Sequence, residues 1–453
     1  MSNFIDTLTV AKFGGTSMGS VDAMESAAKI VNANPTIRLV VVSATSGTTN
    51  QLLHVYKAAV RGETLVVNDL LGALEHRHLE MAKNLNAHPS TLDEIFSELS
   101  NTAKEITTES PRQLDQLLSF GERMSAQLFR AALEKNHITA HTVDARTLLA
   151  TNSFFGKAEP QIEATRAHCA RNLLARLKEK EVLVTEGFIG ADSHGATTTL
   201  GRGGSDYSAA LLAEAIEATN LEIWTDVSGI LTMDPRTVKE AKIIREISFA
   251  EAAELANFGA KVLHPATLLP AMRAGTIVFV KNTFSPFDPG TKIYAELADK
   301  PLFRAVAVRN NQTLITVSSL RMLNAHGFLA KIFAVLAEHE LSVDLVTTSE
   351  VSVALTIDGT SLGSSGKGIR ENKALFDALS TIAEVRIEEN LSLIALIGNH
   401  LTQSAGIAAR AFACLGDVNV RLICHGASHN NLCFLVDSEQ ANTAAQHLHR
   451  AFL

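Results

Sequence analysis

The chain has 453 residues, 46% of them hydrophobic and only 10 of them proline, which is enough to bury large cores in two or three globular domains. Its formal net charge of −8, with no long run dominated by lysine or arginine, argues against a surface for nucleic acid or for anionic membranes. The amino-terminal segment lacks the pattern of a secretory signal, and no apolar run is long enough to span a bilayer. We therefore expect a soluble, cytoplasmic protein that binds any anionic substrate through locally placed cations.

Up to about residue 300, short β-branched runs alternate with amphipathic helical stretches. Strands are predicted at 8–13, 38–44, 138–145, 181–189, 221–227 and 276–282, and helices at 20–31, 163–177, 206–216 and 248–258. The segment from about 64 to 135 favours helix and is predicted to be a helical insertion. The alternation predicts an α/β domain in which a mainly parallel sheet is sandwiched by helices.

Turn signals near residues 285–301 indicate a domain boundary. Beyond it, the order strand, helix, strand, strand occurs twice, first within 313–357 and again within 391–437. We therefore predict a first domain over 1–295 and two small α+β units of the βαββ type over 305–385 and 386–453. The Gly/Ser-rich stretch 360–368 is predicted to be a loop, and no function is assigned to it.

The segment TTTLGRGGSD, residues 197–206, ends where helical periodicity begins. Backbone N–H groups and hydroxyls at a helix N-terminus favour a bound anion, and glycines let a ligand approach the backbone closely. The segment matches neither a Walker A loop nor GxGxxG. Taken alone, it is explained equally well as a glycine-rich turn in which Ser205 or Asp206 caps the helix.

A second glycine pair follows the first predicted strand. In VAKFGGTSM, Lys12 lies at the strand end and Gly14 and Gly15 precede the next helix. This places Lys12 at the carboxyl edge of the sheet, where open α/β folds bind ligands. WTDVSGILTMDPR (224–236) and FGAKVLHPAT (258–267) are further candidates. Each has an ordinary alternative: a solvated lysine, a DPR turn, and a structural histidine at 264.

Together and in this order, KFGGTS, TTLGRGGSD, WTDVSGILTMDPR and FGAKVLHPAT, followed by a repeated tail, resemble the aspartokinases of the amino acid kinase family over nearly the whole chain. Within that family, the sequence is most similar to the lysine-sensitive, single-function type, aspartokinase III. The resemblance implies phosphorylation of the β-carboxylate of L-aspartate by ATP to 4-phospho-L-aspartate, the first step of lysine, threonine and methionine biosynthesis. Because that carboxylate is ionised at neutral pH, transfer needs charge neutralisation and alignment rather than a general base.

The resemblance also assigns the catalytic site. It implies Lys12, Arg202 and Asp206 as catalytic residues, with the guanidinium of Arg202 on a carboxylate of aspartate. Glu122 is expected to bind the α-ammonium group. The remaining substrate contacts are Thr49 and Ser205. The implied ATP contacts are Lys12, Gly14, Gly15, Thr225, Asp226, Leu231, Arg236 and Lys261, with Mg²⁺ held by phosphate oxygens and water and by no protein ligand.

Three positions depart from the family pattern. Leu231 stands where tyrosine is usual, so one contact on the adenine side is altered. Ala325 stands where serine is usual in the regulatory region, and Glu186 stands where glutamine is usual. No role is assigned to Glu186 from the sequence.

The repeated tail resembles a pair of ACT domains, which are small regulatory modules that bind amino acids. The resemblance implies feedback inhibition by L-lysine and a homodimer, possibly a tetramer, formed through these domains. Either Asp344 or Glu350 is expected to pair with an ammonium group of lysine. The implied lysine contacts are Met322, Gly327, Phe328, Leu329, Ser342, Val343, Asp344, Ser349 and Glu350.

Two other functions are considered. One is a kinase of the same fold that acts on glutamate or acetylglutamate, which the repeated tail and the runs FGAKVLHPAT and TTLGRGGSDYSAALLA disfavour. The other is an amino-acid sensor with an inactive kinase domain, which the presence of Lys12, Arg202, Asp206 and Lys261 disfavours. We expect no attached homoserine dehydrogenase, because the chain ends soon after the second repeat and its tail has no GxGxxG after a strand.

Overall fold

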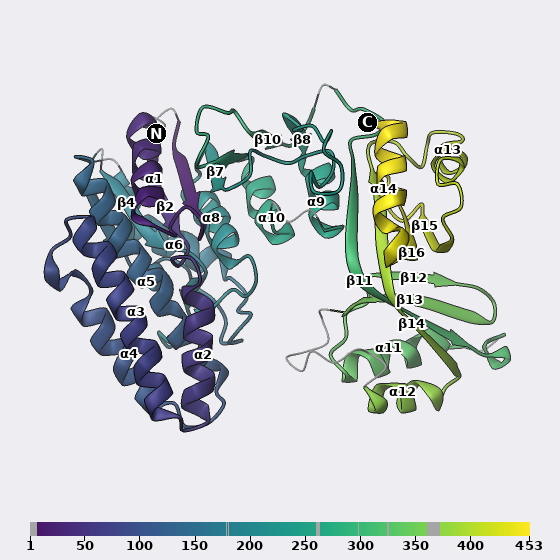
Figure 1. Ribbon diagram of the computed structural model, residues 1–453, viewed down its shortest axis with the longest axis horizontal. Helices are drawn as coiled ribbons and strands as arrows, with labels where there is room; N and C mark the ends of the chain where they lie inside the picture. The colour runs from purple at the N-terminus through teal and green to yellow at the C-terminus, as the bar shows by residue number, and fades with distance from the viewer. Residues whose placement is uncertain are drawn as a thin grey trace. The chain divides into compact units, whose positions relative to one another are not determined.

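The computed structural model describes residues 7–177, 179, 181–259, 263–297, 299–323, 326–359 and 372–453. The chain forms two compact units (Figure 1). The first contains Met1–Ile230, Ile243–Phe249 and Lys261–Leu297, and the second contains Leu231–Lys242, Ala250–Ala260 and Ala298–Leu453. The predicted loop at 360–368, Lys261 and Ala325 lie outside the described residues.

The first unit is built on an eight-stranded sheet with the order β3-β4-β2-β1-β7-β9-β10-β8. All pairs from β3 to β9 are parallel, whereas β10 runs antiparallel to β9 and parallel to β8. The predicted mainly parallel sheet is therefore confirmed, and β8 and β10 are additional short strands that the sequence pattern did not indicate. The strands are β1 (Thr9–Phe13), β2 (Ile37–Val42), β3 (Ala140–Val143), β4 (Val182–Glu186), β7 (Asn220–Thr225), β8 (Glu246–Ser248), β9 (Ile277–Asn282) and β10 (Thr291–Tyr294). A separate pair is formed by β5 (Ile189–Ala191) and β6 (Thr197–Thr199).

Helices cover both faces of the eight-stranded sheet. The helices of this unit are α1 (Val21–Ala33), α2 (Thr48–Val60), α3 (Thr64–Asn84), α4 (Asp93–Glu105), α5 (Pro111–Lys135), α6 (Ile162–Asn172), α7 (Leu174–Leu177), α8 (Gly204–Ala215) and α10 (Pro265–Ala274), with short 3₁₀ turns η1 (Pro89–Leu92) and η2 (Ala145–Thr147). Helices α1 and α5 share one core with Phe13, whereas α8 packs on the opposite face. Because side chains alternate along a strand, Lys12 points to the α8 face.

The segment predicted as a helical insertion contains α3, α4 and α5. Ser110 accepts a hydrogen bond from the N–H of Gln113, and Pro111 occupies the first turn of α5. This cap and proline set the start of α5, because the first helical N–H groups have no partner within the helix. In the described part of the chain, no helix combines the length and the apolar character needed to cross a membrane.

The second unit is built on a six-stranded antiparallel sheet, ordered β12-β13-β11-β14-β16-β15. Its two long central strands each contribute to two separate cores. Val306 and Ile394 belong to one core, while Ile315 and Ile387 belong to the other. The elements are β11 (Ala305–Ser318), η3 (Leu320–Met322), α11 (Phe328–Glu338), β12 (Leu345–Thr348), β13 (Ser352–Asp358), α12 (Lys373–Ser380), β14 (Glu384–Ile397), α13 (Ile407–Ala413), β15 (Val420–His425), β16 (Asn431–Asp437) and α14 (Ser438–Phe452).

The two small units of the tail are therefore interlocked rather than simply consecutive. The first half of β11 packs in the core that contains α13 and α14, and its second half packs in the core that contains α11 and α12. β11 passes from one core to the other where its pairing with β14 shifts register, between Arg309 and Leu314. The domain boundaries at 305–385 and 386–453 stay a prediction.

Two segments of the predicted first domain, Leu231–Lys242 and Ala250–Ala260, belong to the second unit. Met233 and Val238 are buried in the core that contains α14. In α9 (Phe249–Asn257), the buried Glu251 pairs with Arg304 at 2.8 Å, and its carboxylate also accepts a hydrogen bond from Asn399. Because each segment is anchored by packing or by a buried ion pair, both belong structurally to the second unit.

Candidate functional site

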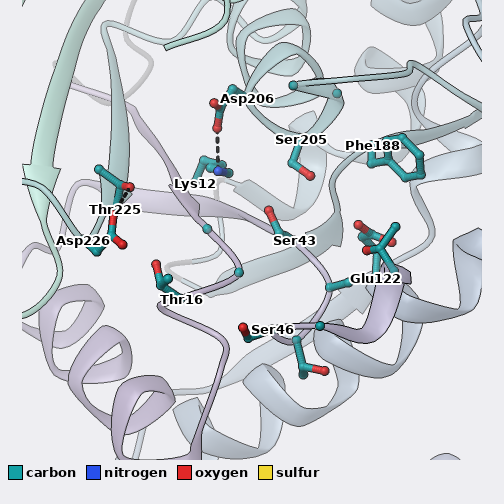
Figure 2. A pocket seen from close by; sticks show the side chains of 18 of the residues that line it. Lys12, Thr16, Ser43, Ser46, Glu122, Phe188, Ser205, Asp206, Thr225 and Asp226 are labelled. Atoms are coloured by element: carbon teal, nitrogen blue, oxygen red, sulfur yellow. Dashed lines mark hydrogen bonds and ion pairs between the residues drawn. The ribbon is translucent and has the colours of Figure 1, made fainter. Parts of the chain in front are cut away.

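A cavity of about 560 Å³ lies in the first unit at the carboxyl ends of the parallel strands (Figure 2). It is lined by residues at or just after the ends of β1, β2, β4 and β7, by the first residues of α2 and α8 with the turn before each, and by Glu122 of α5. Two helix N-termini thus border one cavity, and their unpaired N–H groups and dipoles favour negative charge there. The arrangement suits an anionic ligand.

Lys12 and Asp206 form an ion pair in this cavity. Lys12 is the last residue but one of the buried strand β1, and its Nζ lies 2.5 Å from Oδ1 of Asp206, in the first turn of α8 (Figure 2). Both side chains are largely buried, at 10% and 17% exposed. A Cβ atom on Gly14 would lie 3.4 Å from this Nζ, so the glycine leaves room for a ligand beside the ammonium group.

The turn that leads into α8 depends on glycine. Gly201 and Gly203 have φ values of 74° and 73°, in the region that favours glycine. A Cβ on Gly203 would lie only 2.5 Å from Cβ of His264, a residue that caps α10. The turn leads directly into α8, as the sequence predicted, and Ser205 in the first turn of this helix lines the cavity.

The loop from β2 to α2 forms a wall of the cavity that the sequence analysis missed, apart from Thr49. Ser43 and Ser46 line the cavity from this loop. Arg77 of α3 donates to the carbonyl of Ser46 at 3.2 Å, and His78 lies 3.0 Å from the hydroxyl of Thr45. Burial lowers the pKa of His78 to about 4, so the imidazole is neutral at pH 7. The missed signal was SATSGTT, a run of small residues directly after a buried strand.

Glu122 is a buried carboxyl group on the floor of the cavity. It is 4% exposed and accepts a hydrogen bond from the N–H of Ala44, while its Oε2 has no hydrogen-bond partner among the described residues. Burial raises the pKa of Glu122 to about 8, the charge of Glu186 raises it too, and Lys12 opposes the shift. A buried oxygen that lacks a donor and faces the cavity is suited to a cationic group of a ligand.

The structure brings most of the predicted catalytic-domain residues to this one cavity. Arg202 is exposed and is not among the residues that line it. Leu231 and Arg236 belong to the second unit, where Arg236 pairs with Asp234 at 2.6 Å. The predicted residues that line the cavity are Lys12, Gly14, Gly15, Thr49, Glu122, Ser205, Asp206, Thr225 and Asp226. Their individual roles stay predictions.

The residues predicted to bind lysine occupy connections around α11 and β12. Met322 and Gly327 lie between β11 and α11; Phe328 and Leu329 begin α11; Ser342, Val343 and Asp344 precede β12; Ser349 and Glu350 lie in the turn after β12. The carboxylate of Asp344 already has a cationic partner, Arg309 of β11, at 3.3 Å. Burial raises the pKa of Asp344, and the charge of Arg309 opposes that shift.

The described residues contain no cluster of three or more histidine, cysteine, aspartate or glutamate side chains arranged to hold a metal ion. The carboxylates of Asp206 and Asp226 line the cavity from separate elements.

Comparison with known proteins agrees with the fold. The amino acid kinase family matches residues 7–282, and the ACT domain family matches residues 394–452. The chain thus combines the amino acid kinase fold with an ACT-containing region.

Among individual proteins, the chain is 47% identical to lysine-sensitive aspartokinase 3 of Escherichia coli over 98% of both sequences. It is 36% identical to aspartokinase 1, chloroplastic, of Arabidopsis thaliana, over 98% of this chain and 80% of that protein. The crystal structure of E. coli aspartokinase III in complex with aspartate and ADP matches with a TM-score of 0.87 at 46% identity, over 98% of this chain and 99% of the other. The chain belongs to the aspartokinases.

Proposed function

We propose that this protein is an aspartate kinase that transfers the γ-phosphoryl group of ATP to the β-carboxylate of L-aspartate and is inhibited by L-lysine. The observation that carries the proposal is the buried pair of Lys12 and Asp206 in a cavity bordered by two helix N-termini. The product, 4-phospho-L-aspartate, would feed the synthesis of lysine, threonine and methionine in the cytoplasm. The E. coli relative was solved with aspartate and ADP, and also with lysine and aspartate, which supports this choice of ligands.

The phosphate groups are assigned to the side of the cavity formed by Lys12, Gly14 and Gly15. Phosphoryl transfer proceeds with negative charge on the transferred group, so positioned cations and N–H donors supply most of the catalysis. Lys12 is the one cationic side chain among the described residues that line the cavity, which makes it the group that neutralises the phosphates. Mg²⁺ is assigned to phosphate oxygens and water, with no fixed protein ligand.

The amino acid substrate is assigned to the side formed by Thr49, Glu122 and Ser205. The unpaired Oε2 of Glu122 receives the α-ammonium group. Arg202 is assigned to a carboxylate of aspartate, because it is an exposed guanidinium on the turn that leads into Ser205. The substrate β-carboxylate is an ionised nucleophile at neutral pH and therefore needs no base.

The nucleotide is assigned to the strand-end residues Thr225 and Asp226, together with Leu231, Arg236 and Lys261. Thr225 and Asp226 line the cavity, and the hydroxyl of Thr225 donates to Asp226 at 3.2 Å. The side chains at 231, 236 and 261 are assigned by family resemblance alone. Leucine at 231 offers only apolar contact to the adenine.

Lysine is assigned to the connections around α11 and β12, and a homodimer is proposed through the same region. β12 is an edge strand, and its Val346 is 38% exposed. On α11, Leu329 and Phe333 are also exposed, at 40% and 38%. An open sheet edge beside exposed apolar side chains favours pairing with a second copy.

The first test is the capture of acyl phosphate by hydroxylamine in the presence of Mg·ATP and aspartate, with and without lysine. We expect an aspartate-dependent signal that lysine suppresses. Glutamate and acetylglutamate are tested in parallel as alternative substrates. A larger signal with either acid than with aspartate would show that aspartate is not the preferred substrate. A wild-type protein that binds lysine but transfers no phosphoryl group to any of these acids would support the sensor interpretation instead.

A further inference from the structure

A second buried glutamate, Glu186, lies next to the cavity but does not line it. It is the last residue of β4 and is 6% exposed. Val182 and Val184 of the same strand pack in the core shared with α5. Because side chains two residues apart share one face of a sheet, Glu186 also points toward α5, the helix that carries Glu122.

The end of β2 contacts the segments that carry Glu186 and Glu122. Val42, the last residue of β2, pairs in register with Glu186, and its carbonyl accepts a hydrogen bond from the N–H of Gly187 at 2.8 Å. Two residues further along, the N–H of Ala44 donates to the carboxylate of Glu122. The segment from Val42 to Ala44 therefore contacts both the end of β4 and the carboxylate of Glu122.

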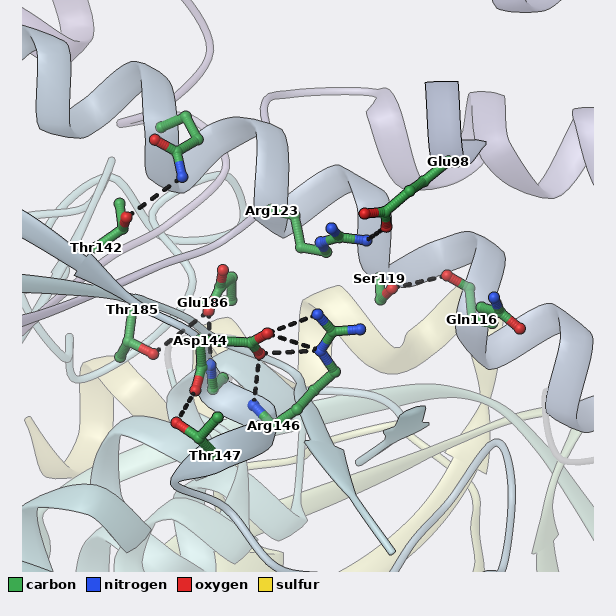
Figure 3. Close-up of polar contacts among 12 residues, drawn as sticks. Glu98, Gln116, Ser119, Arg123, Thr142, Asp144, Arg146, Thr147, Thr185 and Glu186 are labelled. Carbon is green, nitrogen blue, oxygen red and sulfur yellow. Dashed lines mark hydrogen bonds and ion pairs between the residues drawn. The ribbon is translucent and has the colours of Figure 1, made fainter. Parts of the chain in front are cut away.

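The charged groups around Glu186 are already engaged with one another (Figure 3). Arg123 of α5 pairs with Glu98 of α4 at 2.7 Å, and Arg146 of η2 pairs with Asp144 at 2.5 Å. Within the described chain, the hydrogen bonds to the Glu186 carboxylate come from the N–H of Ala145 at 2.8 Å and the hydroxyl of Thr185 at 3.5 Å.

Glu122 and Glu186 therefore form a pair of buried acids with little direct compensation. Burial raises the pKa of Glu186 to about 7, and the charge of Asp144 raises it further, against the effects of the Ala145 N–H and of Arg123. Lys12, on β1, is the cation that acts on Glu122 from the cavity side. The charge of Glu186 in turn disfavours the ionised form of Glu122.

We propose that Glu186 is a positioning residue for the amino acid substrate, because its carboxylate sets the charge that Glu122 presents to the substrate ammonium group. This inference rests on the proposed function for the role of Glu122. In the unliganded protein, the pair keeps a proton at neutral pH. Binding of the ammonium group favours ionised Glu122, and the proton leaves Glu122 for solvent, so binding weakens as the pH falls.

The decisive measurement is an NMR titration of ¹³C-labelled glutamate carboxyl groups in the unliganded full-length protein. Glu122→Gln and Glu186→Gln each remove one signal and thereby assign it. We expect the wild-type signals of both residues to titrate in two steps, because the groups interact. In Glu186→Gln, the Glu122 signal should titrate in a single step and at lower pH, by roughly one pH unit.

The matched control is Glu163→Gln, the same chemical change at an exposed residue of α6 whose ion-pair partner is Arg166. It should leave the Glu122 titration unchanged. Glutamine at 186 retains an oxygen that accepts the N–H of Ala145, so the fold is expected to persist. If Glu186→Gln fails to fold, the two-step titration of the wild type still decides the question. Single-step curves in the wild type, or an unchanged Glu122 curve in a folded Glu186→Gln, would overturn the proposal.

Kinetics then separate a positioning role from a structural one. The KM for aspartate in the wild type should rise by up to tenfold for each pH unit below about 8, the pKa of Glu122. In Glu186→Gln, that rise should begin at lower pH, so KM at pH 7 falls by roughly three- to tenfold, while kcat and the KM for ATP stay within twofold. If the wild type uses no aspartate, the proposed function fails, yet the titration of the unliganded protein still reports on the pair.

Discussion

The cavity in the first unit and the predicted lysine region in the second differ in how their charged groups are held. Lys12 and Glu122 are buried and are positioned by a strand end and a helix interior. Ser349 and Glu350, by contrast, are exposed in a turn after an edge strand. Phosphoryl transfer requires charged groups that are already oriented when the substrate arrives. The fold therefore holds these groups in buried positions, although burial disfavours their charged forms.

Asp344 is intermediate between these two cases. Its carboxylate pairs with Arg309, and the same guanidinium also binds Asp358 at 2.6 Å. Arg309 lies where β11 passes from one core of the second unit to the other. We therefore expect substitutions in the cavity to have larger effects than those in the lysine region, with Asp344 showing a selective effect on regulation.

The largest effect is expected for Lys12→Ala. Loss of the ammonium group removes charge neutralisation at the phosphates and leaves Asp206 buried without its partner. We expect kcat to fall by roughly 10²- to 10³-fold, the range found when one oriented donor to a transition-state oxygen is removed. The hydroxylamine assay measures this loss, with the exposed Lys29→Ala of α1 as the control. A fall of less than tenfold would remove Lys12 from the catalytic assignment.

The next effect concerns stability as a function of pH. Glu186 has a pKa of about 7 in the folded chain against an ordinary value of 4.5, so the folded state binds the proton more tightly. The contribution of Glu186 to the unfolding free energy is therefore fully present below about pH 5 and is lost as the pH rises to about 7. Between about pH 5 and pH 7, the unfolding free energy of Glu186→Gln should therefore fall by about 3 kcal/mol less than that of the wild type. This figure follows from about 1.4 kcal/mol per pKa unit. Urea unfolding at several pH values tests this, and parallel curves would contradict it.

Gly187→Ala tests the close approach between β4 and α8. A Cβ at this position would lie 2.7 Å from Cβ and 2.9 Å from Cα of Ser205, so the strand end or the helix must move. We expect a loss of about 1–3 kcal/mol in unfolding free energy and a higher KM for aspartate. Gly72→Ala is the matched control, because this exposed residue of α3 has no atom within 4 Å of an added Cβ. It should stabilise the protein by about 0.5–1 kcal/mol, and equal effects at both sites would refute the packing argument.

The smallest effect on catalysis is expected for Asp344→Asn. The change removes a carboxylate that pairs with a lysine ammonium group in the proposed regulatory site, so the inhibition constant for lysine should rise by roughly tenfold. The kcat measured without lysine should stay within about twofold of the wild-type value, because Asp344 belongs to the second unit and is not among the residues that line the cavity. Inhibition curves for Asp344→Asn and Glu350→Gln identify which carboxylate binds lysine. If neither shifts the curve, the lysine assignment in this region is wrong.

Local patterns predicted a large part of the fold and of the cavity. The alternation of β-branched runs with amphipathic stretches indicated the parallel sheet, and Lys12 was placed at its carboxyl edge because a glycine pair follows the strand. The same reasoning missed Ser43 and Ser46, although they also follow a buried strand. It also placed the start of β11 too late: the first repeat was predicted to begin at residue 313, which covers only the half of β11 that packs with α11.

The sequence by itself determined most of the strands and helices, and several of the small residues that follow the strands, because side-chain periodicity and glycine geometry act over a few neighbouring residues. Tertiary structure alone decided that Lys12 meets Asp206, that Glu186 lies beside Glu122, and that Arg202 remains exposed. It also decided that β11 serves two cores. These features depend on contacts between residues far apart in the chain, and burial then changes the charge that each carboxyl group carries.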